Sequence, residues 1–128
     1  MSTDESLSPE VRQVCARMDE YLAAIAKATE EQQKVVGHGM NNGSAFMVKE
    51  FGSVASFRTA GRTGQLKFLD RLNAMVQQLE PTHMGIAWGL RIFWVYARLL
   101  MEEDPHIASR YFPEVARLGK LGATLARQ

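Results

Sequence analysis

Residues 85–101, GIAWGLRIFWVYARLLM, are the most apolar stretch of this 128-residue chain. Their apolar side chains recur every three or four residues on two faces of a helix, one running from Ile86 to Leu100 and the other from Trp88 to Leu99. A helix that is apolar on two sides needs packing partners on both. We therefore expect this helix to lie in the middle of an all-α fold.

Two arginines, Arg91 and Arg98, lie seven residues apart within this stretch. A guanidinium group is costly at the centre of a bilayer, and the stretch is shorter than the roughly 20 residues that span one. We therefore expect a buried helix and no membrane contact. Because both arginines interrupt an apolar pattern, they are expected to face the solvent edge or a partner.

The N-terminal part of the chain carries a signal for the start of a helix at Ser8 and Pro9. Ser8 can cap a helix whose first residue is Pro9, where the missing N–H is harmless. Apolar residues then recur at helical spacing up to Ile25, and Gly37 is the expected end. The sequence therefore predicts a long N-terminal helix, preceded by a flexible tail over residues 1–8.

The middle of the chain alternates turn-forming and helical segments. The glycine- and asparagine-rich residues 37–44 favour an exposed loop. Residues 45–58 favour a helix, although their β-branched and aromatic residues also suit a strand. The clearest helical pattern covers residues 63–79, and Pro81 ends it. Its expected core positions are Leu66, Leu69, Leu72, Val76 and Leu79.

Two more helix starts follow the apolar stretch, at Asp104-Pro105 and at Phe112-Pro113. The length of the chain suits one domain. We therefore predict a single-domain bundle of about five helices over residues 9–128.

Composition places the chain among folded proteins of a reducing compartment. Hydrophobic residues make up 46% and charged residues 23%, unlike the low-hydrophobicity, high-charge mixture of disordered chains. The single cysteine, Cys15, cannot form an internal disulfide, and no basic-then-apolar segment opens the chain. We therefore expect a cytoplasmic protein.

The residues that usually carry catalysis are isolated. The three histidines lie far apart, Cys15 falls on an apolar stripe where a buried role is expected, and Glu102 can pair with Arg98 one turn earlier. We therefore expect no enzymatic activity, no cofactor and no metal site.

Basic side chains gather between residues 56 and 71. The net charge of the chain is only +1, but residues 37–128 hold eleven lysines and arginines against seven acids. In the basic segment, glycines and threonines surround the start of a helix, where free N–H groups favour phosphate. We predict a nucleic-acid backbone site there, made by Arg58, Arg62, Lys67 and Arg71.

Residues 58–69, RTAGRTGQLKFL, resemble a segment of the small subunit of type III, Cmr-type, CRISPR effector complexes. The shared features are an arginine, a glycine and an apolar helix that contains Leu-x-Phe, with Arg62 standing where that family has an apolar residue. The resemblance implies a non-catalytic subunit of a ribonucleoprotein, which stacks in copies beside other subunits. It also implies contact with the backbone of guide and target RNA, and it carries a role over to Arg58.

Two other functions fit the pattern. Helices over 45–58 and 63–80, joined by a turn at Gly61, could form a helix-turn-helix regulator that binds DNA, with Gln65 and Lys67 reaching base edges. The chain could also be a protein-interaction or assembly module with no nucleic-acid role, in which the first helix packs against a partner.

Overall fold

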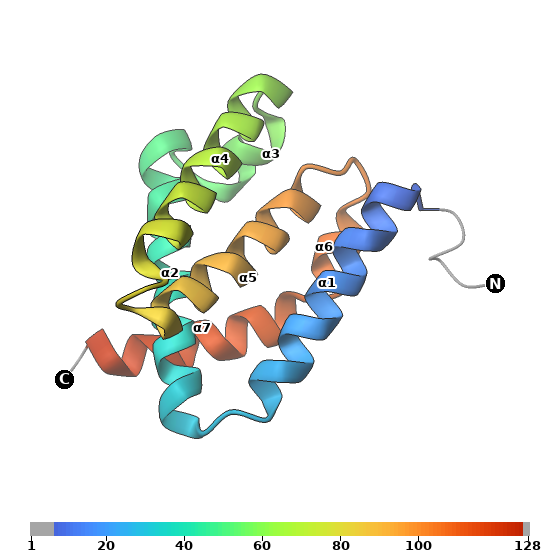
Figure 1. Ribbon diagram of the computed structural model, residues 1–128. Coiled ribbons are helices and arrows are strands. Elements are labelled where there is room, and N and C mark those ends of the chain that lie inside the picture. Colours follow the sequence, from blue (N-terminus) through green and yellow to red (C-terminus); the bar gives the residue numbers. More distant parts are fainter. Residues whose placement is uncertain (1–6, 127–128) are drawn as a thin grey trace.

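The computed structural model describes residues 7–126, which form seven helices and no strand (Figure 1). The all-α class predicted from the sequence is confirmed, with seven helices where about five were expected. Of the predicted tail, residues 1–6 lie outside the described part, and Leu7 packs against the core. The helices are α1 (Pro9–Ala26), α2 (Glu30–Phe51), α3 (Val54–Thr59), α4 (Arg62–Leu79), α5 (Met84–Leu100), α6 (Pro105–Ser109) and α7 (Phe112–Ala126).

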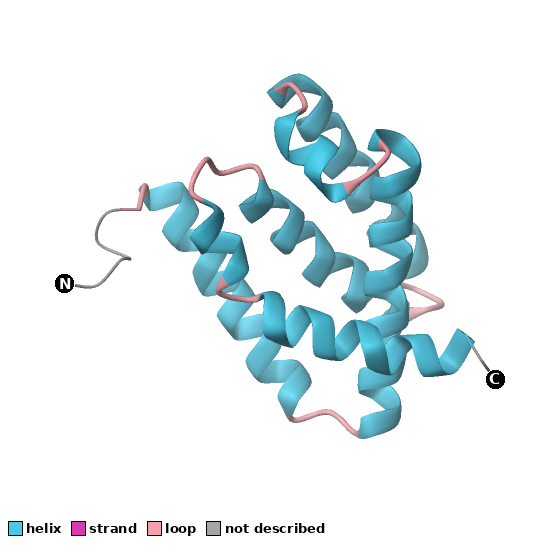
Figure 2. Ribbon diagram, turned by 180° about the vertical axis from the view of Figure 1, so that it is seen from behind, coloured by secondary structure: helices cyan, strands magenta, loops and turns pink. Residues whose placement is uncertain are grey.

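Helix α5 is the centre of the fold, as its two apolar stripes predict. It packs against α1, α2 and α4, so that it is covered on several sides (Figure 1). Leu90 and Ile92, one from each stripe, are both fully buried. Helix α7 packs mainly on α2, and short loops join the helices (Figure 2).

The first helix is shorter than predicted, because a second helix start interrupts it. Helix α1 ends at Ala26, and Thr29 caps α2. The Thr29 hydroxyl accepts a hydrogen bond from the Gln32 amide at 3.1 Å, and the Gln32 side chain accepts one from the Thr29 amide at 2.9 Å. This reciprocal pair satisfies amides that have no partner within the helix, so it stabilises a break there. The prediction of one long helix reaching Gly37 was wrong.

The expected exposed loop over residues 37–44 is wrong too, because these residues lie inside α2. Four of them, Gly37, Gly39, Met40 and Gly43, are buried. A Cβ atom at Gly37 would overlap the carbonyl oxygen of Leu118, and one at Gly39 would overlap that of Ile86. The glycines therefore serve close helix packing and not a turn.

Helices α2 and α7 cross where two glycines meet. A Cβ atom at Gly122 would overlap the backbone of Gly37, and one at Gly37 would overlap the backbone of Leu118 and Gly122. Gly89 of α5 lies equally close to the α2 backbone. Helix α2 therefore touches both neighbours backbone to backbone, which only residues without a side chain allow.

The predicted helix over residues 45–58 is divided between α2 and α3. Helix α2 ends at Phe51, and the next residue, Gly52, has a φ of 92°, in the left-handed region that favours glycine. Ser53 then caps α3 by accepting a hydrogen bond from the Ser56 amide at 3.0 Å.

Helix α4 keeps the predicted core positions Leu69, Leu72 and Val76, but its start is rotated relative to the prediction. Leu66 is 43% exposed, whereas Gln65 is buried and its side-chain amide donates to the carbonyl oxygen of Phe57 at 2.8 Å. The buried position near the start of α4 is therefore polar, and its hydrogen bond fixes α3 against α4.

Arg98 is buried, contrary to the expectation that it faces solvent or a partner. Only 6% of its side chain is exposed, and its guanidinium pairs with Glu102 at 2.5 Å and with Glu10 at 2.8 Å. The expected pairing with Glu102 is confirmed. The hydrogen bond from Arg98 and its positive charge lower the pKa of Glu10 below its ordinary value. This network joins the start of α1 to the end of α5.

Candidate binding surfaces

Arg58 is turned toward the end of α5. Its Nε donates to the carbonyl oxygen of Leu100 at 3.2 Å, and its Nη2 donates to that of Glu102 at 3.4 Å. The last carbonyl groups of a helix have no partner within the helix and carry partial negative charge. The half-buried Arg58 therefore satisfies the carboxyl end of α5, and its position is explained by the fold alone.

The other three predicted site residues lie on α4 and are exposed. Arg71 forms an ion pair with Glu50 of α2 at 3.2 Å. Within residues 7–126, no ion pair joins Arg62 or Lys67 to a carboxylate, although the charge of Arg62 contributes to the lowered pKa of Glu10. The four cations predicted as one site therefore do not form a single open cluster.

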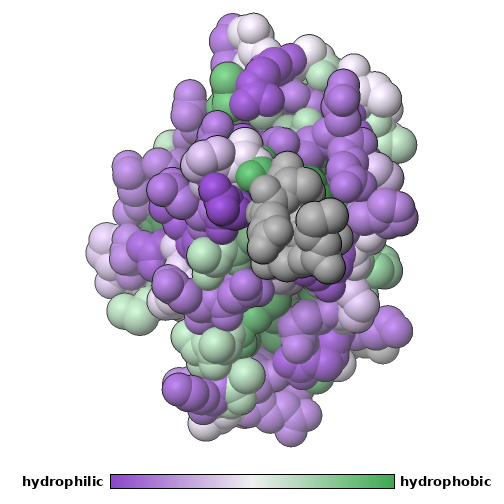
Figure 3. All heavy atoms as spheres, turned by 90° about the vertical axis from the view of Figure 1, so that its right-hand side faces the viewer, coloured by the Kyte–Doolittle hydropathy of each residue, from purple (hydrophilic) through white to green (hydrophobic). Residues whose placement is uncertain are grey.

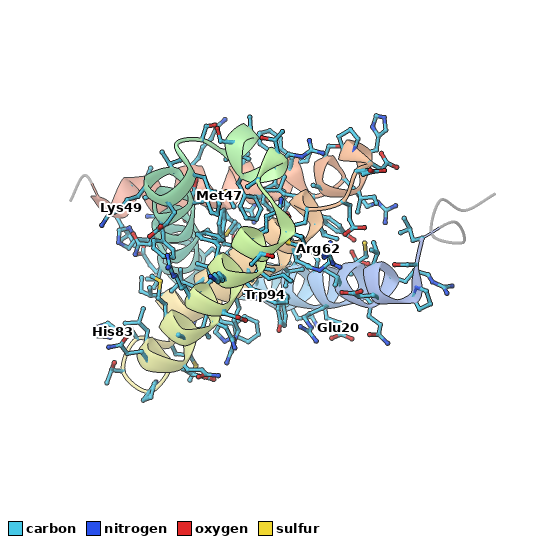
Figure 4. All side chains as sticks on the ribbon, turned by 90° about the horizontal axis from the view of Figure 1, so that it is seen from above. Glu20, Met47, Lys49, Arg62, His83 and Trp94 are labelled. Atoms are coloured by element: carbon cyan, nitrogen blue, oxygen red, sulfur yellow. The ribbon has the colours of Figure 1, made fainter. Side chains whose placement is uncertain are left out.

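Lys67 and Arg71 do come together, on the side of α4 that faces α2. They line a shallow hollow of about 190 Å³ with Gly64 and Glu50, so its charge is mixed. Arg62 lies at the start of α4, and in Figure 4 it is well separated from Lys49 of α2. Lys49 of α2 and Arg62 of α4 therefore do not belong to one basic cluster.

The start of α4 keeps one feature that favours anions. Its N-cap is Gly61, which has no side chain to accept a hydrogen bond from the first-turn amides. Residues 61–64 are all exposed. First-turn amides that no cap occupies, together with the positive end of the helix dipole, attract phosphate oxygens.

Helices α2, α3, α5 and α7 enclose an apolar groove, called the α7 groove here. Its volume is about 610 Å³. At its edges, Phe112 is 56% exposed and Val54 is 37% exposed. Its walls are formed by Met40, Asn41, Ser44, Val54, Phe93, Tyr96, Phe112, Val115, Ala116, Gly119, Lys120 and Ala123.

The small side chains of α7 open this groove. Ala116, Gly119 and Ala123 are spaced by three and four residues, so they share one face of the helix. The side-chain amide of Asn41 donates to the carbonyl oxygen of Gly119 at 2.9 Å. This hydrogen bond holds α2 against α7 beside the groove. Sequence reasoning missed the groove because it took Phe112 only as a helix start; the available signal was an aromatic residue three positions before Val115, on the same face of the helix.

Comparison of the chain with protein-family models, with curated proteins and with solved structures found no match. The resemblance to the Cmr-type small subunit stays a prediction that depends on residues 58–69. No helix in the described part of the chain has the length and apolar content needed to cross a membrane.

The residues considered for catalysis occupy separate elements. His38 lies within α2, whereas His83 and His106 lie near the starts of α5 and α6. Across residues 7–126, no group of three His, Cys, Asp or Glu side chains is placed to hold a metal ion. Cys15 is buried, as expected.

The helix-turn-helix alternative loses one of its two proposed base-reading side chains. Gln65 is buried, and its amide is bonded to the backbone of Phe57. The first helix of that motif is also divided, with α3 covering only Val54–Thr59. Lys67 alone remains exposed for a role at base edges.

Another surface of the molecule, around the start of α1, is mostly polar. Figure 3 shows hydrophilic residues over most of this side, with hydrophobic ones between them in small patches.

Proposed function

We propose that this chain is a non-catalytic helical subunit of a larger assembly and that it docks onto a partner protein through the α7 groove. The observation that carries the proposal is the exposure of Phe112 beside an apolar groove of about 610 Å³. Apolar clefts rimmed by polar residues are typical of protein-interaction sites. An exposed aromatic residue next to a pocket is the usual anchor of such a contact.

The shape of the groove favours a helix as its occupant. It follows α7 from Phe112 to Ala123, which corresponds to about three turns or about 17 Å of helix. Helix-in-groove recognition uses apolar anchors at this spacing. Lys120 lines the groove and is exposed, so an acidic residue on the partner helix would complement it. The expected partner segment is an amphipathic helix with an acidic edge.

The test uses a designed amphipathic peptide with leucines along one face and glutamates beside them, titrated against ¹⁵N-labelled protein. Amide shifts are expected at Ala116, Gly119 and Ala123. Phe112→Ala should weaken binding by about tenfold or more, because truncating an aromatic anchor residue costs about 2 kcal/mol or more. Met84→Ala, at an exposed methionine in a separate hollow, is the matched control and should change little.

Charge reversal makes this test specific. Lys120→Glu should weaken binding of the glutamate peptide. A peptide with lysines in place of the glutamates should bind the Lys120→Glu variant with the lost affinity restored. Equal affinities of the Phe112→Ala variant and the unchanged protein, or shifts confined to residues outside the groove, would contradict the proposal.

A second candidate function is binding of a nucleic-acid backbone, which the start of α4 favours. Exposed Arg62 and Lys67 lie near first-turn amides that have no side-chain cap. In this reading the chain is the subunit of a type III CRISPR ribonucleoprotein that contacts guide and target RNA, as the resemblance implies. The two functions are compatible, because such a subunit also contacts neighbouring proteins.

The salt dependence of single-stranded RNA binding tests this candidate. The Arg62→Ala, Lys67→Ala double variant is expected to reduce the slope of log affinity against log salt by about 1.4, since each phosphate contact on a single strand contributes about 0.7. Arg12→Ala, Lys27→Ala removes the same charge from exposed positions of α1 and its C-cap and should leave the slope unchanged. Equal slopes for both double variants would exclude the α4 site.

A further inference from the structure

A hollow between α1, α4 and α5 brings together hydrogen-bond donors from three parts of the sequence. Its volume is about 230 Å³. Arg17 and Tyr21 come from α1, Asn73 from α4, and Arg91 and Trp94 from α5. Neither the α7 groove nor the start of α4 includes any of these residues. The hollow is therefore a separate feature of the molecule.

The donors of α5 are held in place by neighbouring groups. Arg91 forms an ion pair with Glu80 at 2.6 Å, and its guanidinium lies 5.4 Å from the centre of the Trp88 ring. The indole N–H of Trp94 donates to the carbonyl oxygen of Leu69 at 3.0 Å, which fixes this ring between α5 and α4 (Figure 4). One wall of the hollow is thus rigid before any ligand arrives.

The second arginine of the hollow, Arg17, comes from α1 and can bind a ligand. Arg17 is exposed, and within residues 7–126 no ion pair joins it to a carboxylate. Tyr21, one turn further along α1, packs edge-on against the Trp88 ring, and it also lines the hollow. Asn73 adds an exposed side-chain amide from the opposite wall.

The charged side chains that line this hollow are both arginines. No aspartate or glutamate belongs to its lining. Within residues 7–126, the acidic partner of these arginines is Glu80, which pairs with Arg91 and is not part of the lining. Two guanidinium groups, an amide and a phenol can donate several hydrogen bonds to one oxyanion, and arginine forks onto phosphate oxygens in pairs. We propose that this hollow binds the phosphate group of a nucleotide or of a nucleic-acid strand.

The test titrates three probes, inorganic phosphate, adenosine monophosphate and a short single-stranded RNA, into the ¹⁵N-labelled full chain. The indole N–H of Trp94 and the side-chain amide of Asn73 give resolved signals that report directly on the hollow. Both are expected to shift on saturation. Arg17→Ala should weaken binding by about tenfold, the contribution expected of a charge-assisted hydrogen bond.

The control is Arg12→Ala, which removes an exposed arginine of the same helix that does not line the hollow. It should leave the affinity unchanged. Saturation by the mononucleotide or by phosphate assigns the hollow to a small phosphorylated ligand, and saturation by RNA alone assigns it to a strand phosphate. Either result supports the site if Arg17→Ala weakens binding of the probe that saturates it. The proposal is overturned if no probe shifts the two signals or if both arginine variants bind equally well.

Discussion

Replacing Gly122 by alanine is expected to lower the free energy of unfolding by about 3 kcal/mol, which corresponds to a fall in Tm of about 10 °C. The added methyl group would overlap the backbone of Gly37 and His38. Backbone atoms of a packed helix cannot move aside as a flexible side chain can. Helix α7 would therefore have to shift away from α2 and lose part of its contact.

A second glycine gives the matched control for this prediction. Gly64 lies inside α4, where a Cβ atom would meet no atom within 4 Å. Gly64→Ala should therefore raise stability by about 0.5 to 1 kcal/mol, through the higher helix propensity of alanine. Thermal unfolding of both variants measures the difference. A higher Tm for Gly122→Ala would show that α2 and α7 do not touch at this crossing.

The Arg98→Ala substitution is expected to have an effect of similar size, a loss of about 3 kcal/mol in unfolding free energy. Its guanidinium is buried and bonded to two carboxylates, so removing it leaves Glu102 without its partner and a cavity beside α5. Arg71→Ala removes an exposed arginine from an ion pair with Glu50 and should change stability by less than about 1 kcal/mol. Urea unfolding of the two variants checks the contrast.

The pH dependence of unfolding identifies the contribution of Glu10. Its pKa is lowered in the folded protein, so its pairing stabilises the fold above the ordinary glutamate pKa of about 4.3. This contribution is lost as the pH falls through the lowered folded pKa. The gap in stability between the unchanged protein and Arg98→Ala should therefore narrow in acid. A difference in stability between the two proteins that stays constant from neutral pH to a pH below the folded pKa of Glu10 would contradict the role of Glu10.

The central helix could be predicted because its pattern depends on local spacing. Two apolar stripes on residues 85–101 require neighbours on both sides, whatever those neighbours are. Helix α2 could not be predicted in this way, because Gly37 is equally suited to a turn and to close contact with another helix. Only the position of α7 decides between them. The Thr29-x-x-Gln32 capping box was a readable local signal for the true start of α2.

The candidate sites were harder to predict than the fold. The charge of Arg58 suggested phosphate contact, yet its guanidinium satisfies carbonyl oxygens 42 and 44 residues further along the chain. Such a pairing follows from tertiary packing and leaves no local pattern. The donors around Arg17 are likewise spread over three helices, so no single segment signals the hollow between them.

The pairing of Glu10 with Arg98 affects how this protein should be produced. Glu10 lies in the first turn of α1, close to the beginning of the chain, and its partner is in the interior. A purification tag placed before Ser8 keeps the carboxylate. A shortened version beginning after Glu10 would leave the guanidinium with Glu102 as its only acidic neighbour among the described residues, and poor expression of such a version should not be taken for an intrinsic defect of the fold.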